Sequence, residues 1–245
     1  MQITALYRHT LKSHGREALE RVTLHAGQSM PYDRHWAVAH EAAKADGSKW
    51  APCVNFSRTS KAPGLAAINA TFDDASGLLS LTHPERPDLT FNPDTDGAAF
   101  LEWVHPIVPH DRALPARILR LADRGFTDSP YASVSLCNTA SHGAVEDLHG
   151  GALSLLRWRG NVWFDGAAPW DEMEWVGRDL RLGQAKLHVR DLTQRCLATT
   201  ASPETGARDA DTLAALDQLG HQYFGVYAEV IETGEIALGD RLELI

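Results

Sequence analysis

Short apolar segments alternate with polar turns along the first hundred residues. The segments MQITALYRH, EALERVTLH, RHWAVAHE, LAAINATFD, GLLSLTHP and LTFNP are rich in β-branched, aromatic or aliphatic residues. Gly, Pro, Asp and Asn separate them at intervals of roughly ten residues, a spacing typical of β-sandwiches and barrels. The pattern predicts a mainly β fold with a few short helices, beginning with an antiparallel, barrel-like domain over residues 1–108.

The pattern changes after the last of these segments. Residues Gly97–Val108 can open as a short helix, which must end before Pro106 because proline lacks the backbone N–H and clashes with the preceding turn. We expect residues 109–127 to be a connecting segment. A second β domain is predicted over residues 128–245.

Within this second domain, VSLCN (Val134–Asn138) is a candidate buried strand. Residues Thr139–Gly151 read as a capped short helix that ends in glycine. The pieces GRDLRLG and GEIALGDRLEL, further along, predict hairpins and strands of a small closed barrel. PWDEMEWVG is expected to pack and cap a helical turn.

Composition narrows the class of protein. In 245 residues, 44% are hydrophobic and 22% are charged, which is typical of a globular protein with an apolar core. No apolar run reaches the length of a membrane span, and the first residues lack the pattern of a secretory signal. The 3 cysteines lie far apart and form no disulfide framework, so we expect a reducing, cytoplasmic setting.

The charge balance argues against a partner that is a nucleic-acid polymer or an anionic membrane. The 23 basic and 32 acidic side chains give a net charge of −9. Basic residues are nevertheless kept locally, as where Arg157 and Arg159 flank a tryptophan. Such placement indicates a defined anionic ligand, whereas Arg16 and Arg21 are expected to be solvated surface charges.

One cysteine has unusual neighbours. Cys196 lies in QRCLATTASPETG (Gln194–Gly206), directly after Arg195 and before a run of hydroxyl residues. A cationic neighbour favours the thiolate, the form that attacks electrophiles and binds metals. The same sequence is also compatible with a half-buried structural cysteine at the end of a strand. A lone cysteine does not distinguish the two roles, because it carries little information.

The stretch RWRGN provides several hydrogen-bond donors. In an extended strand, Arg157, Arg159 and Asn161 would point to one side and form an array suited to phosphate or a polar heterocycle. Gly160 would allow a ligand to approach the backbone closely. A surface strand whose arginines stack on tryptophans accounts for the stretch equally well.

Further donors and the absent motifs complete this picture. Lys12 and Ser13 follow the first strand, and Arg34 lies between two aromatic residues; these side chains either hold an anion or belong to the surface. The sequence contains no histidine pair with metal-ligand spacing and no CxxC. GxSxG, GxxxxGK[ST] and GxGxxG are absent too, which argues against serine hydrolases, P-loop proteins and dinucleotide-binding folds.

Four motifs in order resemble the MOSC domain, the molybdenum cofactor sulfurase C-terminal domain. They are RWRGNVWFDG, WDEMEWVGRDLRLGQAKLHV, TQRCLATTASPETG and YFGVYAEVIETGEIALGD. The first half resembles the β-barrel domain that precedes it in this family, through Lys12-Ser13 and Asp33-Arg34-His35-Trp36. The described relatives include the mitochondrial amidoxime-reducing component and bacterial reductases of N-hydroxylated bases.

The resemblance implies a cofactor and a set of site residues. Cys196 would be the thiolate ligand of molybdenum in the molybdenum cofactor (Mo-molybdopterin), and it would be the catalytic residue. Tyr223 and Tyr227 lie where the family closes the pocket, and Tyr223 is the one we assign to it. The implied cofactor-binding residues are Lys12, Ser13, Arg34, Arg157, Arg159, Asn161 and Tyr223.

The first half departs from the family pattern in three places. YPxKS appears as HTLKS, GDR appears as YDR, and TxRxxP is present only loosely, in NFSRTSKAPGL. No iron–sulfur cysteine cluster follows the last motif. We therefore expect electrons to come from a separate donor protein of the iron–sulfur, haem or flavin type.

Three functions are compatible with these residues. The first is a molybdenum-dependent oxidoreductase that reduces small N-oxygenated, specifically N-hydroxylated, compounds. The second is a non-catalytic carrier of the molybdenum cofactor, or of sulfur on Cys196. The third is a β-barrel interaction module without a cofactor, which the ordered motifs disfavour.

Overall fold

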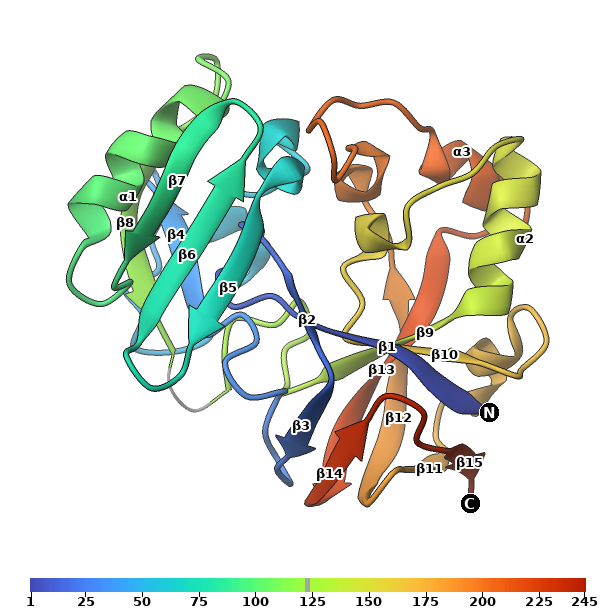
Figure 1. Ribbon diagram of the computed structural model, residues 1–245. Coiled ribbons are helices and arrows are strands. Elements are labelled where there is room, and N and C mark those ends of the chain that lie inside the picture. Colours follow the sequence, from blue (N-terminus) through green and yellow to red (C-terminus); the bar gives the residue numbers. More distant parts are fainter. Residues whose placement is uncertain (122–123) are drawn as a thin grey trace.

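Fifteen strands and three α-helices make up residues 1–121 and 124–245, the part of the chain that this computed structural model describes (Figure 1). The mainly β fold with few short helices is therefore confirmed. The elements of the first half are β1 (Gln2–Arg8), β2 (Glu17–Leu19), β3 (Arg21–Leu24), β4 (Trp36–His40), β5 (Asn69–Asp73), β6 (Leu78–His83), β7 (Arg86–Phe91), α1 (Gly97–Val104) and β8 (Pro115–Arg120). Those of the second half are β9 (Val134–Asn138), α2 (Thr139–His149), β10 (Val162–Asp165), β11 (Asp179–Leu182), β12 (Ala185–Gln194), α3 (Thr212–Asp217), β13 (Tyr223–Glu232), β14 (Gly234–Ala237) and β15 (Leu242–Leu244).

The second half is built on one eight-stranded sheet in the order β15-β11-β12-β13-β9-β10-β1-β2. Strands β9 and β10 are parallel, and the connection between them carries α2. The remaining neighbours in this sheet are antiparallel. Parallel neighbours need a long crossover, and here the helix of that crossover also covers one face of the sheet.

Strand β9 is buried along its whole length, so the prediction of VSLCN as a buried strand is confirmed. Val134 and Leu136 pack into the core on one face of the sheet. Cys137 packs into a second core on the other face, together with Val145 of α2. The predicted helix is confirmed as well, because Asn138 caps its start through the N–H of Ala140, and Gly150 ends it in a left-handed conformation.

The first half has its own apolar core between the meander β5-β6-β7, helix α1 and the ribbon β4-β8. Helix α1 contributes Phe100, Trp103 and Val104, whose spacing places them on one helical face. It ends at Val104, before Pro106, and continues as a 3-10 turn over His105–Ile107. The predicted end of this helix is confirmed.

The segment 109–127, which we expected to connect the two domains, contains a strand. Residues Pro115–Arg120 form β8, which pairs with β4 in antiparallel register. Pro115 is the first residue of this strand, a position where proline is tolerated. Residues 122 and 123 of the segment lie outside the described part of the chain.

Two of the first three strands pair with the second half of the chain. Strand β1 lies against β10, and β3 lies against β14. The backbone N–H of Leu242 donates to the carbonyl of Met1 at 3.0 Å, so the large sheet curls until its last strand reaches its first (Figure 1). The domain division at residues 108 and 128 stays a prediction. Strands from both halves of the chain nevertheless pair within the same sheets.

Candidate functional site

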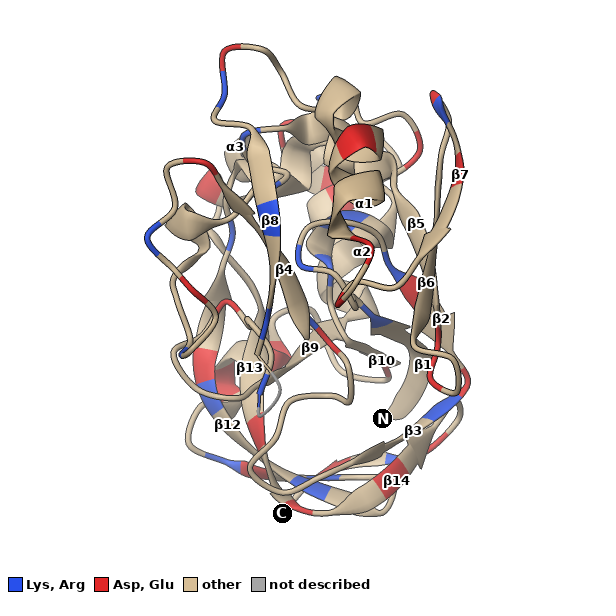
Figure 2. Cartoon of the chain, turned by 90° about the vertical axis from the view of Figure 1, so that its left-hand side faces the viewer, with Lys and Arg blue, Asp and Glu red and all other residues tan. Residues whose placement is uncertain are grey.

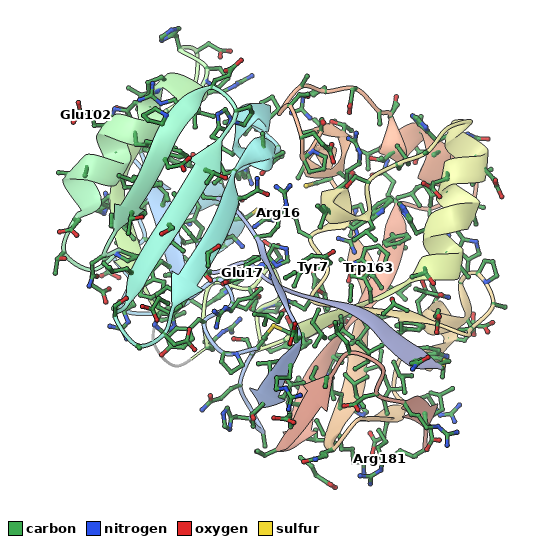
Figure 3. The ribbon with its side chains drawn as sticks, in the orientation of Figure 1. Tyr7, Arg16, Glu17, Glu102, Trp163 and Arg181 are labelled. Carbon is green, nitrogen blue, oxygen red and sulfur yellow. The ribbon has the colours of Figure 1, made fainter. Side chains whose placement is uncertain are left out.

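A cavity of about 460 Å³ lies at the junction of the two halves. Loops of the first half form one wall, and the turns around β10, β12 and β13 form the other. Figure 3 shows Arg16, a residue of the first half, between the two halves. The lining residues are Lys12, Ser13, Arg34, Cys53, Arg58, Thr59, Ser60, Lys61, Asp128, Ser135, Arg157, Trp158, Arg159, Gln194, Arg195, Cys196, Leu197, Ala198, Thr199 and Tyr227.

Most of the residues singled out from the sequence meet in this cavity. They come from four separate segments of the chain, and their assigned roles stay predictions. Two of the eight do not line the cavity, namely Asn161 and Tyr223. The six that do are Lys12, Ser13, Arg34, Arg157, Arg159 and Cys196.

Cys196 follows the end of β12 in extended backbone, directly before a 3-10 turn over Leu197–Thr200. Its thiol is free and exposed. The N–H and the hydroxyl of Thr199 both donate to the carbonyl of Cys196 at 3.1 Å. The same hydroxyl lies 2.6 Å from that of Thr212. The hydroxyl-rich stretch therefore fixes the backbone that presents the thiol.

We expected Arg195 to favour the thiolate of Cys196, but its guanidinium is engaged elsewhere. Its guanidinium donates to the carbonyls of Trp158 at 2.7 Å and Phe224 at 2.6 Å and lies over both aromatic rings. Its contact with sulfur is to Cys137, at 3.8 Å. Successive residues of an extended backbone point to opposite sides, so neighbours in sequence are separated here. Arg195 thus fastens the Trp158 turn to β13.

RWRGN is not the extended strand that we predicted. Residues Leu155–Trp158 form a 3-10 turn, and Arg159 is left-handed with φ 51°. The strand begins only at Val162. Arg157 and Arg159 reach one cavity because the turn brings them together, rather than through strand alternation.

Gly160 and Asn161, the last two residues of this stretch, have structural roles. A Cβ on Gly160 would lie 2.6 Å from the Cys137 Sγ, so this glycine makes room for a buried thiol. The amide oxygen of Asn161 accepts from the N–H and the hydroxyl of Ser135, at 3.1 and 2.9 Å. Its amide nitrogen donates to the carbonyl of Tyr7 at 3.2 Å. Asn161 therefore joins β9 to β1 and holds Ser135, which does line the cavity.

Three cations of the cavity are paired with carboxylates. Lys12 Nζ lies 2.5 Å from Asp128 and donates to the carbonyl of Phe126 at 2.7 Å. Desolvation at the cavity wall opposes the ionisation of Asp128. The charges of Lys12 and then Arg34 nevertheless lower the pKa of Asp128 to about 2. The other two pairs are Arg34 with Asp33, and Arg157 with Asp209 at 2.6 Å.

Arg159 differs from these three. Within residues 1–121 and 124–245 it forms no ion pair, and its Nη2 donates to the carbonyl of Gly15 at 3.2 Å. Burial, followed by the charges of Arg34 and Arg16, lowers the pKa of Arg159 to about 9. A positive charge held beside two others without a counter-ion would be stabilised by a bound anion.

Arg157 is also only partly satisfied. Its side chain is 7% exposed, and its Nε and Nη1 have no hydrogen-bond partner among the described residues. Arg157, Arg159 and Arg16 together border a small side lobe next to the main cavity. Arg16 was expected at the surface, but it is buried and joins the halves by donating to the carbonyls of Ala66 and Pro203. Arg21 is exposed, as expected.

Tyr227, rather than Tyr223, faces the cavity. The pairing of β12 with β13 shifts between Leu192 and Gln194, opposite Gly225, which has φ 72°. Such a bulge breaks the alternation from which the side of each tyrosine would be read. Burial, and next the charge of Asp128, raises the pKa of Tyr227, so its phenol is a neutral hydrogen-bond donor.

Our sequence reasoning missed the loop that follows Cys53. Cys53, Arg58 and Lys61 all line the cavity, and Arg58 Nη1 donates to the Cys53 Sγ at 2.9 Å. NFSRTSKAPGL was noticed only as a loose family match, and its two cations were the available signal. Our sequence reasoning also assigned no role to Asp128, which lines the cavity.

Residues 123–243 match the family model of the MOSC domain. The chain is therefore a MOSC-domain protein, as its motifs predicted. MOSC domains as a family are associated with binding of the molybdenum cofactor. Within the described residues, no helix is both long and apolar enough to cross a membrane.

Two solved structures are similar to the chain. The crystal structure of YiiM from Geobacillus stearothermophilus shares 20% identity over 46% of this chain and 53% of that one, with a TM-score of 0.35. The chain thus matches about half the length of the YiiM structure. The YuaD protein from Bacillus subtilis shares 12% identity over 100% of this chain and 96% of that one, with a TM-score of 0.48. No curated protein matches the chain.

Proposed function

We propose that the cavity binds the molybdenum cofactor, with Cys196 as the protein's metal ligand, and that the protein reduces small N-hydroxylated compounds. The observation that carries this proposal is the arrangement of an exposed thiol and several cations around one cavity, with Arg159 forming no ion pair among the described residues. A thiolate is a soft ligand suited to such a metal. The cations suit the negatively charged phosphate of a pterin cofactor.

The residues present fit this group. Arg157 has two buried nitrogens without a partner among the described residues, and Arg159 lacks a carboxylate there. An unsatisfied buried donor is costly, so both side chains favour a ligand that accepts their hydrogen bonds. In the same part of the chain no group of three or more His, Cys, Asp or Glu is placed to hold a metal ion. A metal at Cys196 therefore needs further donors from a bound group, which the cofactor's dithiolene supplies.

The reaction breaks one N–O bond. It takes up two electrons and two protons, forms the N–H compound and releases the oxygen as water. When bound, the cofactor supplies a metal that accepts and delivers these electrons. Lys12, Arg34, Arg157 and Arg159 would hold the cofactor, and Tyr227 would donate a hydrogen bond to a substrate oxygen because its phenol stays neutral.

Metal and pterin content test the binding part of the proposal. The protein is purified from a host that makes the cofactor, and molybdenum and pterin are measured per chain. We expect close to one of each. Absence of both would overturn the proposal and favour an interaction module without a cofactor.

The catalytic part depends on a source of electrons. Because the sequence has neither an iron–sulfur cysteine cluster nor a dinucleotide fingerprint, we propose a separate donor protein. The loaded protein should reduce an N-hydroxylated compound with reduced viologen, but not with NADH alone. Turnover with NADH alone would contradict the separate donor. Loaded protein without turnover on either donor would favour a carrier of the cofactor, or of sulfur on Cys196.

A further inference from the structure

The loop that follows Cys53 adds two cations to the cavity wall. Arg58 and Lys61 lie between the 3-10 turns Cys53–Asn55 and Pro63–Ala67. Arg58 is half-buried and Lys61 is exposed. In the described part of the chain neither forms an ion pair with a carboxylate, and Arg58 is steadied by its 2.9 Å contact with the Cys53 Sγ.

These two cations are distinct from those assigned to the cofactor. Lys12, Arg34 and Arg157 are each less than a tenth exposed. Arg159 and Arg157 also border the side lobe, whose lining does not include Arg58 or Lys61. With the inner cations engaged by the cofactor, the outer pair still faces the cavity with its charge uncompensated.

The two positive charges of this loop lie on a protein whose net charge is negative. The chain carries a net charge of −9, and Figure 2 shows acidic and basic residues interspersed over the side that it displays. A protein of this charge repels anions at long range, so local cations decide which anions enter. Leu197, which also lines the cavity, is 50% exposed and is followed by Ala198, so the cavity offers an apolar contact as well.

We infer that this outer wall, formed by Arg58 and Lys61, recognises a negatively charged group on the substrate. The preferred substrates are then small N-hydroxylated compounds that carry a carboxylate or a phosphate on an apolar body. The anionic group lies at Arg58 and Lys61, and the body contacts Leu197. The substrate preference rests on the proposed function, whereas the anion-binding wall stands on the side chains themselves.

A matched pair of compounds tests this inference. Benzamidoxime and 4-carboxybenzamidoxime share the same reacting N–OH group and differ by one carboxylate. Binding of each to the cofactor-loaded protein is measured by calorimetry, and reduction is measured with viologen. Each exposed or half-exposed ion pair contributes up to about fivefold in affinity, so we expect about tenfold tighter binding of the carboxylate compound.

Two double variants separate the local effect from net charge. In Arg58→Gln/Lys61→Gln the preference should vanish. The variant Arg21→Gln/Arg181→Gln also removes two positive charges, but from a surface groove far from the cavity. In this variant the preference should persist. Figure 3 shows Arg181 at the far end of the molecule from Arg16.

The outcomes are distinguishable. Equal binding of both compounds by the unsubstituted protein, or a preference that survives in Arg58→Gln/Lys61→Gln, overturns the inference. A tenfold preference in binding, without reduction of either compound, overturns the reductase and supports the anion-binding wall. A preference in both binding and kcat/KM, lost only in the loop variant, supports both.

Discussion

The guanidinium of Arg34 donates to the backbone carbonyl of Arg159 at 3.1 Å. Arg34 belongs to the first half of the chain and Arg159 to the second, so one cavity cation holds the backbone of another across the junction. Arg34 is itself anchored by Asp33, whose side chain is fully buried. The positive wall of the cavity is therefore a pre-organised unit, and its parts can be tested singly.

Arg159→Ala should weaken retention of the cofactor. A charge-assisted hydrogen bond contributes about 1.5–3 kcal/mol, which corresponds to roughly tenfold to hundredfold in affinity. The measurement is pterin content per chain after gel filtration. Arg21→Ala, at an exposed position, serves as the control and should keep full content. Equal pterin in both variants would remove Arg159 from the binding site.

Cys196→Ser should abolish viologen-driven turnover and lower the molybdenum content, while the protein stays folded. The side chain is exposed, so the substitution changes little packing, whereas a hydroxyl is a poor ligand for a soft metal. Cys137→Ser is a better control than Cys53→Ser, because Cys53 also lines the cavity whereas Cys137 does not. It should keep its metal, with a lower Tm from burial of a hydroxyl. Full turnover in Cys196→Ser would exclude the cysteine from the mechanism.

Stability should fall in mild acid because of buried histidines. Burial lowers the pKa of His14 to about 4, and burial together with Arg159 lowers that of His9 to about 3. A histidine in the unfolded chain titrates near 6.5, so below that pH the unfolded state binds protons that the folded state does not. We expect the free energy of unfolding to drop by about 2 kcal/mol per ring between pH 7 and pH 5.

Urea unfolding at several pH values measures this effect. His14→Asn keeps a donor for the Lys12 carbonyl, which His14 contacts at 2.7 Å, and should remove about 2 kcal/mol of the pH dependence. His110→Asn, at an exposed position, should leave the dependence unchanged. An unaltered slope in His14→Asn would show that its titration does not govern acid stability.

Gly225→Ala should destabilise the fold. The glycine has φ 72°, and an added Cβ would lie 2.5 Å from the carbonyl oxygen of Leu136. Strain of this kind costs about 1–3 kcal/mol. Gly143→Ala is the matched control, since its Cβ would meet nothing within 4 Å inside α2. Alanine there should stabilise the helix by about 0.5–1 kcal/mol, and thermal unfolding reports both changes. A Gly225→Ala variant as stable as the parent would mean that the bulge is not needed.

Local signals in the sequence predicted the elements that depend on local physics. The buried run VSLCN, the capped helix after it, and the end of α1 before Pro106 were all read correctly. The course of RWRGN was not, because a left-handed Arg159 is set by the packing of Gly160 on Cys137 and by Arg195, which lies far along the chain.

The candidate site follows the same division. Motifs identified Cys196, the arginines and the two tyrosines of YFGVY by residue type. No local pattern placed Arg58 or Lys61 beside them, or selected Tyr227 over Tyr223. The side that Tyr227 faces depends on a bulge, and the loop with Arg58 is placed by contacts with distant residues of both halves. One such contact is from Arg208 to the carbonyl of Ser60, at 2.9 Å. Such long-range contacts leave no periodic trace in a sequence.

The pairing of β1 with β10 has a consequence for how the protein is made. Strand β1 is synthesised before its partners. Gln2 pairs with Asp165, and the Met1 carbonyl accepts a hydrogen bond from Leu242, so this edge of β1 stays unpaired until those residues have been made. Non-local pairings of this kind slow folding, and an unpaired strand edge is prone to aggregation while it waits. The large sheet can therefore close only once the residues around Leu242 have been synthesised.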